Sequence, residues 1–205
     1  YAPNISAYIA DRVASKRVQP GTVSSTDRST WLQAEFFRYD GAADHAVAPA
    51  EGNLTDHRIW MGDPANLNQR SLAGFIHDDW GNVLSETDAR GNVTSHGYDT
   101  TRHLFRVATT NAASHVVQTG WNTTCQAPSS QTDPNAQVTT FTYDLFCREV
   151  LRTLPDGQYQ TTRYMNLGDA TAQYIETESL SASVAAGQTL RIARQYLDGL
   201  GQVWK

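Results

Sequence analysis

Apolar and polar residues alternate with a period of two over short runs along the chain, which is typical of half-buried β-strands. The clearest run is Val138–Tyr143, where Thr139, Phe141 and Tyr143 share one face. The segment 144–147 then supplies a turn and 148–153 returns. This pattern predicts a β-hairpin.

Two earlier stretches are also predicted to be strands. Residues 31–39 alternate between two sets that are both largely apolar, which favours a strand covered on both faces. Ile5, Ala7 and Ile9 alternate as well, although Ile5 and Ile9 would also suit a short helix. We expect a strand there.

The hairpin pattern is repeated. Residues 87–99 have a counterpart at 132–144, with a worn copy at 110–122 and a further copy at 154–164. An earlier, more distant copy opens at Tyr39-Asp40 and continues at residues 52–55. The residues that mark the regular copies are His77, Tyr98, Trp121, Tyr143, Tyr164 and Tyr196, at separations of 21, 23, 22, 21 and 32. The longer last interval predicts an inserted hairpin around residues 185–188.

Each copy carries turn-forming residues at both ends. An Asp at the start of a turn can bond the backbone two residues further on, and Gly adopts a positive φ easily. The residues expected to mark these turns are Asp40, Asp78, Gly81, Asp88, Gly91, Asp99, Asp133, Asp144, Gly199 and Gly201. A lone hairpin is marginal in water, so we predict an all-β fold of stacked antiparallel hairpins with almost no helix.

The register of the repeat makes two further predictions. Tyr98, Trp121, Tyr143 and Tyr164 should form a buried row on one sheet face, with neighbours roughly 9.6 Å apart. Cys125 and Cys147 each lie four residues after a marker aromatic. Equivalent positions in neighbouring hairpins should be nearly 10 Å apart, whereas a disulfide needs Cα atoms within about 4.4–6.8 Å, so the cysteines should be unbonded.

Composition and charge exclude several classes of protein. The 205 residues are 40% apolar and 18% charged, enough for one domain or two small ones. A net charge of −5 argues against a nucleic-acid partner, and no apolar run is long enough for a membrane span. The chain begins with Tyr1 rather than Met, so we expect a processed piece or a fragment of a longer protein.

Candidate chemistry is sparse. The six histidines show no metal-ligand spacing, and the sequence has no P-loop, no G-x-G-x-x-G and no G-x-S-x-G motif. The many Asp residues could be paired carboxylates or calcium ligands, but nearly all of them fall at turns in the repeat register. We therefore expect no catalytic residue, cofactor or metal site. The aromatic stripe could stack sugars, although packing along a sheet face is the favoured interpretation.

The repeated phrase resembles the YD repeat of Rhs-type proteins. It reads Tyr-Asp-x-x-Gly, then Thr-Asp-x-x-Gly-Asn-Val-Thr, and 77–99 match it best. Residues 196–203 are similar to the family's Tyr-x-Asp-Gly-Leu-Gly-Arg phrase, with Gln202 where Arg is usual. Three copies have lost the Tyr-Asp pair, and the Asp-Pro-x-Gly signatures of the family's self-cleaving segment are missing. The resemblance implies a β-shell that can enclose a C-terminal toxin.

These observations predict a non-enzymatic structural scaffold, the shell region of a toxin-related YD/Rhs-repeat protein that is secreted or at the bacterial cell surface. Its expected partners are other segments or copies of a larger YD-repeat protein, with a toxin cargo or carbohydrate as further candidates. Residues 1–38 are expected to be leading strands of the same domain, and 39–205 the repeat region. The alternative is a carbohydrate-binding or adhesion module of a bacterial surface protein.

Overall fold

The computed structural model describes residues 3–21, 26–181 and 189–203. It divides into two compact units, residues 1–115 and 116–205, each of which is described by itself. The described residues form fourteen β-strands and one 3-10 turn, η1 (Arg28–Thr30). In this part of the chain no helix is long and apolar enough to cross a membrane. The predicted all-β fold is confirmed.

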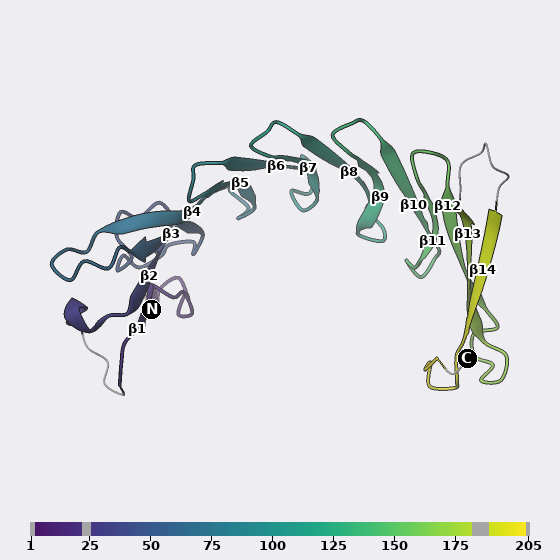
Figure 1. Cartoon of the computed structure of the whole chain (residues 1–205), viewed down its shortest axis with the longest axis horizontal. Helices are drawn as coiled ribbons and strands as arrows, with labels where there is room; N and C mark the ends of the chain where they lie inside the picture. The colour runs from purple at the N-terminus through teal and green to yellow at the C-terminus, as the bar shows by residue number, and fades with distance from the viewer. Residues whose placement is uncertain (1–2, 22–25, 182–188, 204–205) are drawn as a thin grey trace. The chain divides into compact units, whose positions relative to one another are not determined.

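Unit 1 is an antiparallel sheet in which each strand pairs with the next one along the chain (Figure 1). Its strands are β1 (Ser15–Val18), β2 (Gln33–Tyr39), β3 (Leu54–Trp60), β4 (Gln69–His77), β5 (Val83–Asp88), β6 (Val93–Tyr98) and β7 (Arg106–Thr110).

Unit 2 is likewise an antiparallel sheet in which each strand pairs with the next one along the chain. Its strands are β8 (Val116–Asn122), β9 (Ala127–Thr132), β10 (Val138–Tyr143), β11 (Glu149–Thr153), β12 (Tyr159–Met165), β13 (Tyr174–Ser181) and β14 (Thr189–Tyr196). The predicted inserted hairpin turn at 185–188 lies outside the described residues, although β13 and β14 pair antiparallel as far as Ser181 and Thr189.

Five of the marker residues lie at β-bulges at or near the ends of their strands. The register shifts immediately before Tyr39, His77, Tyr98, Trp121 and Tyr143. A bulge places an extra residue opposite one partner residue and increases the local twist. At these five positions the repeated aromatic or His therefore marks the place where the strand leaves the regular ladder, whereas Tyr164 and Tyr196 lie in regular ladders.

Unit 1 holds a small aromatic core. Ala34, Phe36 and Trp60 are buried together, and the Trp31 ring lies 5.5 Å from the Trp60 ring, edge to face. On the opposite face of β2, Phe37 stacks on His57 at 4.6 Å. The strand predicted over residues 31–39 is thus covered on both faces, more tightly on the Phe36 side.

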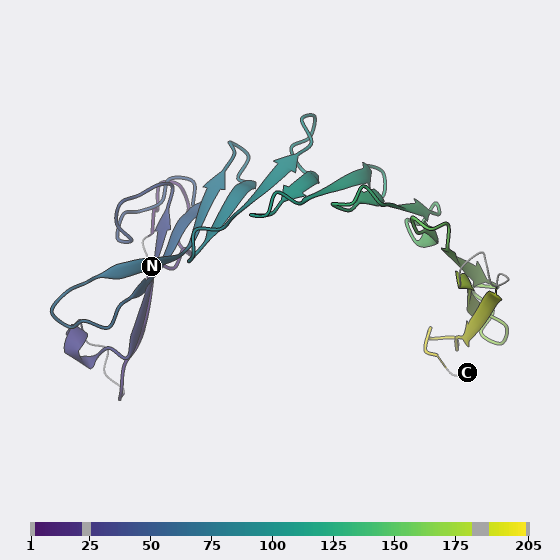
Figure 2. The same ribbon diagram turned by 45° about the horizontal axis from the view of Figure 1, so that its top comes forward.

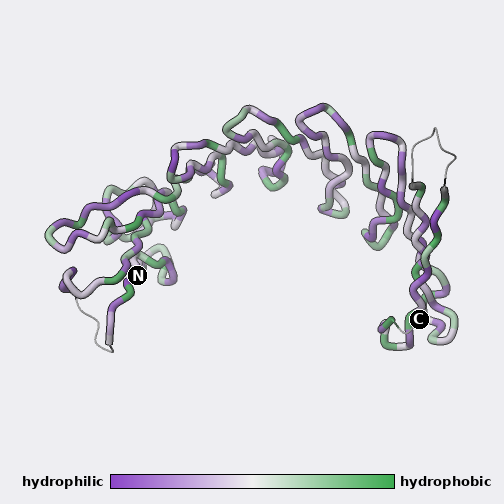
Figure 3. Tube along the Cα trace, in the orientation of Figure 1, coloured by the Kyte–Doolittle hydropathy of each residue, from purple (hydrophilic) through white to green (hydrophobic). Residues whose placement is uncertain are grey.

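Unit 2 has no comparable core among its described residues, where the buried side chains are Gln173 and Glu176. Its strands form a single layer (Figure 2). Apolar and polar positions alternate along its hairpins, with no apolar block at their centre (Figure 3). Its marker aromatics Trp121, Tyr143 and Tyr164 are half-buried, as is Tyr98 in unit 1. The sequence predicted that these four side chains are buried, and that prediction is wrong, because each of them is only half-buried.

The strand predicted at residues 5–9 is wrong. Those residues form a turn closed by a single bridge between Asn4 and Ile9. The Asn4 side-chain oxygen accepts hydrogen bonds from Ser6 and Ala7, and Tyr8 has a φ of 56°. Ile5 is 84% exposed, so its alternation with Ile9 reflects no buried face.

Candidate functional site: the row of turns along the marker edge

The turns after alternate strands lie at the same edge of each antiparallel sheet. In unit 1 these are the turns after β2, β4 and β6, and in unit 2 those after β8, β10, β12 and β14. Each follows a strand on which a marker residue lies at or near the end. We call this edge the marker edge of each unit.

Turns at both edges of the sheets are held by one side chain acting as a double acceptor. In the β4–β5 turn, Asp78 Oδ1 accepts from the backbone N–H groups of Trp80 at 3.0 Å and Asn82 at 2.8 Å. At the marker edge the same pattern recurs at Asp144 and Asp198. At the opposite edge it recurs in the turns that begin at Asp88, Asn111 and Asp133. The carboxylate oxygen thus satisfies two turn donors that would otherwise need water.

The third residue after the acceptor then adopts a positive φ. Gly81, Gly91 and Gly201 take this position at φ 81°, 87° and 79°. Ser114, Ala136 and Cys147 take it at 63°, 60° and 60°, a conformation that L-residues adopt less readily than Gly.

Two longer loops use an Asp in the same way. Asp99 accepts from the backbone N–H groups of Arg102, Leu104 and Phe105. The bond from Phe105, followed by the other backbone donors, lowers the pKa of Asp99 to about 2. Asp40 accepts from four consecutive N–H groups at 50–53, which join the two segments of the earliest repeat copy. Burial raises the pKa of Asp40, but these four bonds outweigh it and leave the pKa lowered.

The turn carboxylates are therefore engaged as hydrogen-bond acceptors. Among the residues that the structure describes, no group of three or more His, Cys, Asp or Glu side chains could hold a metal ion. The chemistry available at these positions is that of turn formation.

Neighbouring turns of the marker edge also contact one another. In unit 1 the Asn82 side chain donates to the His103 carbonyl at 2.7 Å, which links the β4–β5 and β6–β7 turns. The Trp80 and His103 rings stack with centroids 3.4 Å apart and an interplanar angle of 5°. The repeat does not use a fixed residue type at either position, so no sequence pattern predicted this pair.

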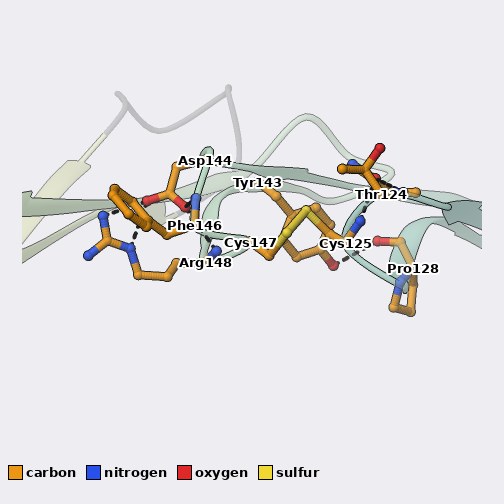
Figure 4. The surroundings of a disulfide bond; sticks show 9 residues. Thr124, Cys125, Pro128, Tyr143, Asp144, Phe146, Cys147 and Arg148 are labelled. Atoms are coloured by element: carbon orange, nitrogen blue, oxygen red, sulfur yellow. Dashed lines mark hydrogen bonds and ion pairs between the residues drawn. A yellow bond between two sulfur atoms is a disulfide. The ribbon is translucent and has the colours of Figure 1, made fainter.

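In unit 2 the β8–β9 and β10–β11 turns are joined covalently. Cys125 and Cys147 form a disulfide with a Cα–Cα distance of 5.1 Å (Figure 4). Beside it, the Tyr143 hydroxyl donates to the Pro128 carbonyl at 2.7 Å. The prediction that the cysteines are unbonded is wrong.

The error comes from the turn lengths. Asp144 and Arg148 close a turn with three residues between them, whereas the turn between the paired residues Asn122 and Ala127 contains four residues. The residue with positive φ is Cys147 in the first turn but Gln126 in the second. The cysteines are therefore one position out of register, and the turns do not keep the spacing of the strands.

Further contacts link the later turns of unit 2. The Arg148 guanidinium pairs with Asp144 at 2.6 Å and lies 3.8 Å from the centre of the Tyr164 ring. Gln173 accepts from the Gly168 N–H and donates to the Asp198 carbonyl. The Leu197 N–H returns a bond to the Gln173 carbonyl. Gln173, which the repeat did not mark, thus ties the turn after β14 to the loop after β12.

The remaining marker residues have separate surroundings. The hydroxyl of buried Tyr39 donates to the Val13 carbonyl at 3.0 Å, and the Tyr196 ring lies 5.3 Å from that of Tyr174. A side chain at Gly199 would meet the Ala170 Cβ at 3.2 Å. For the buried Nδ1 of His77, no partner is present among the described residues. The described contacts of Tyr39, Tyr196 and Gly199 are therefore with other residues of their own units and not with one another.

Unit 1 also contains a cavity of about 280 Å³ beside its aromatic core. Arg17 and Arg28 line it together with Trp31, Phe36 and His45. The Arg17 guanidinium lies 5.1 Å from the Trp31 ring centre. Burial lowers the pKa of His45, so the cationic lining comes from the two arginines. This arrangement could accept a small anionic group.

Known proteins resemble the chain in two ways. The RHS Repeat family model matches residues 77–116, so the predicted Rhs resemblance is confirmed there. The chain is also similar to a crystal structure of TcdB2-TccC3, at 9% identity and a TM-score of 0.67, over 85% of this chain and 12% of that one. That likeness shows a shared fold, and this chain spans only 12% of the TcdB2-TccC3 chain. No curated protein sequence matches the chain.

Weaker structural likenesses involve related assemblies. A crystal structure of TcdB2-TccC3-Cdc42 has a TM-score of 0.45 at 10% identity, over 79% of this chain and 8% of that one. A Photorhabdus luminescens Tc holotoxin pore has a TM-score of 0.41 at 10% identity, over 92% of this chain and 10% of that one.

Proposed function

We propose that this chain is a non-enzymatic wall segment of a toxin-related Rhs-repeat shell. The observation that carries the proposal is the repeated hairpin, ended by a bulged marker residue and a turn-forming Asp or Asn. The turn carboxylates bind backbone N–H groups, as at Asp78 and Asp99, which is the use expected of a scaffold. The fold shared with TcdB2-TccC3 supports the same conclusion.

The single-layer sheet of unit 2 suits a wall. A wall segment needs lateral cohesion between its hairpins more than a thick core, and its faces are completed by other parts of the assembly. Large apolar side chains are indeed exposed on unit 2, including Leu167, Ile192 and Leu200. We propose that other segments of a longer Rhs-repeat polypeptide are the partners of this surface, and that residues 1–38 belong to the same domain as the repeat region 39–205.

The disulfide supports a secreted or cell-surface location. Disulfides form and persist in oxidising compartments and are rare in the cytosol. The Cys125–Cys147 bond therefore favours a chain that matures outside the reducing cytosol.

Cryo-electron microscopy of the natural polypeptide that carries this chain tests the proposal. We expect a hollow particle in which the hairpins of this chain form part of the wall. A polypeptide in which the chain packs into a solid domain, or is bound as a separate module outside any shell, would contradict it. In that case the turn markers would retain a structural role, but the shell assignment would fail.

A second candidate, carbohydrate binding, is favoured by the cavity between Arg17, Arg28 and Trp31. Guanidinium groups recognise carboxylates, and aromatic walls contact the apolar faces of sugar rings. The matching ligand would be a small acidic saccharide. A glycan array with the purified chain distinguishes the two functions, since a wall segment should show no saturable binding. Binding that Arg28→Gln abolishes would favour the saccharide.

A further inference from the structure

We infer that the Cys125–Cys147 disulfide is a thiol-exchange site that acts as a redox-labile clasp between two hairpins of unit 2. The proposal goes beyond the scaffold function and rests on the local geometry of β8–β11. Its reaction partner is a dithiol reductant.

The clasp lies where backbone pairing between the two hairpins is absent. The β9–β10 ladder consists of the pairs Ser130–Thr140, Gln131–Thr139 and Thr132–Val138, all toward the Asp133 turn. Toward the marker edge, β9 continues to pair with β8, and β10 with β11, but not with each other. Pro128 lies in this part of β9 and has no N–H to donate to a ladder.

The two hairpins are therefore joined by a short ladder at one end and by side chains at the other. At the marker edge, the joining groups are the disulfide and the Tyr143 hydroxyl bond to the Pro128 carbonyl (Figure 4). When the disulfide opens, the three-pair ladder becomes a hinge about which hairpin β8–β9 can separate from hairpin β10–β11.

The disulfide is accessible from the turn tip. Cys147 is exposed, and it follows Leu145 and Phe146, which are 100% and 80% exposed. Cys125 is half-buried. A thiolate of the reductant can therefore reach the Cys147 sulfur more readily than the Cys125 sulfur. Exposed disulfides are in general the labile ones, whereas buried disulfides are protected from exchange.

The exchange proceeds in two balanced steps. The reductant thiolate attacks Cys147 Sγ, forming a mixed disulfide and releasing the Cys125 thiolate, which takes up a proton from solvent. The second thiol of the reductant, as its thiolate, then attacks the reductant sulfur of the mixed disulfide and releases Cys147 as a thiolate, which is protonated in turn. Two electrons pass from the dithiol to the protein disulfide, and the reductant leaves as a cyclic disulfide.

Hydrogen exchange on the whole 205-residue chain tests this mechanism, with dithiothreitol as the probe. We expect no free thiols before treatment and two afterwards. Amide exchange should rise by at least tenfold in residues 119–131 and 141–149, with no rise in β2 and β3 of unit 1. The midpoint of thermal unfolding of unit 2 should fall by roughly 15 °C, as estimated for a loop of this length in a domain of this size.

The double variant Cys125→Ser with Cys147→Ser is the matched control. It should exchange as fast as the reduced chain and should not respond to dithiothreitol. Because the parent chain is reduced after folding, a folding defect in the variant would not compromise the test. In a glutathione buffer set to the cytosolic ratio, most of the disulfide should open.

Two results would overturn the proposal. A disulfide that stays oxidised in that buffer would be a permanent structural bond, and a reduced chain with unchanged exchange in residues 119–131 would have no clasp to open. Neither readout requires an assembled shell, so the clasp and the wall assignment can fail independently.

Discussion

The two units share one hairpin repeat but are held together in different ways. Unit 1 buries Phe36, Trp60 and Phe105, whereas among the described residues of unit 2 the buried positions are taken by Gln173 and Glu176. Glu176 is bonded by Arg194 at 2.8 Å and by Arg163 at 3.0 Å, and these two guanidinium groups lower its pKa, Arg194 more than Arg163. The disulfide lies in the unit without an apolar core.

This difference shows what a single-layer sheet needs. Hydrophobic burial is the dominant stabilising term in most folds, and small domains that cannot build a core rely on covalent links. Unit 1 obtains its burial on the leading strands β2 and β3, where Phe36 and Trp60 pack together with Trp31. The described residues of unit 2 form hairpins without such a core. Ladder pairing, turn acceptors, ion pairs and one disulfide have to replace the core.

The largest expected effect tests the core of unit 1. Phe36→Ala removes a side chain that is 2% exposed, and it should destabilise unit 1 by about 4 kcal/mol through lost burial and the cavity left behind. Urea denaturation followed by hydrogen exchange in β2 and β3 measures it. Phe146→Ala in unit 2 is the matched control and should change stability by less than about 0.5 kcal/mol, because Phe146 is 80% exposed. Equal losses of stability from Phe36→Ala and Phe146→Ala would mean that unit 1 does not depend on a buried apolar core more than unit 2 does.

The disulfide should give the next largest effect, confined to unit 2. Removing a link between residues 22 apart should cost about 3 kcal/mol, since the unfolded chain regains the entropy of an open loop. Calorimetry of Cys125→Ser with Cys147→Ser, compared with the parent, measures the loss. If unit 1 loses stability to the same extent, the two units do not unfold separately.

A smaller effect should follow the loss of one hydrogen bond at the same junction. Tyr143→Phe removes the donor to the Pro128 carbonyl and should cost about 1 kcal/mol. Tyr164→Phe is the control, because the described contact of that residue is the Arg148 guanidinium over its ring. A similar loss from both substitutions would mean that the junction contributes nothing beyond ring packing. Urea midpoints of the two variants decide between these results.

The smallest effect is a pH dependence that both units should share. Backbone bonds, first that of Phe105, hold the pKa of Asp99 at about 2, below its ordinary value of 3.8, so the folded state favours the ionised carboxylate. This stabilisation is present above pH 4 and is lost as the pH falls from about 4 to about 2. The thermal midpoint of unit 1 should fall by a few degrees over that interval.

Asp99→Asn provides the control for that titration. An Asn side chain can still accept turn N–H bonds, as Asn111 and Asn122 do, but it does not titrate. The variant should therefore fold, and the thermal midpoint of unit 1 should fall less between about pH 4 and about pH 2 than in the parent chain. If the thermal midpoint of the variant falls as much as that of the parent chain, other carboxylates are responsible for the pH dependence. Burial raises the pKa of Asp144 in unit 2, but the side-chain and backbone bonds of Arg148 leave it lowered, so unit 2 should show the same direction.

Several features were predictable because they depend on short stretches of chain. The alternation in residues 138–143 predicted β10, and the Asp positions at 78, 88 and 144 predicted turns. These interactions join residues two to four apart, so the sequence pattern contains all the partners. The Rhs resemblance rested on the same local phrases. By contrast, the strand predicted at 5–9 failed because alternation alone does not supply a neighbouring strand.

The contacts between turns were not predictable in this way. Trp80 stacks on His103 and Gln173 reaches Asp198 across gaps of more than twenty residues, and neither pair occupies a fixed repeat position. The prediction that the cysteines are unbonded was wrong, because one extra residue in the Asn122 turn moved Cys125 out of register with Cys147.

The sequence by itself determined that this chain forms antiparallel hairpins of a fixed period with Asp-led turns, because alternation and turn chemistry act over a few residues. Only the tertiary structure decided where an apolar core forms, which turns contact one another and whether the two cysteines form a disulfide. Those outcomes depend on the path of each turn in space and on which strands cover which face. A period counted along the chain assumes equal turns, and the turns of this protein are not equal.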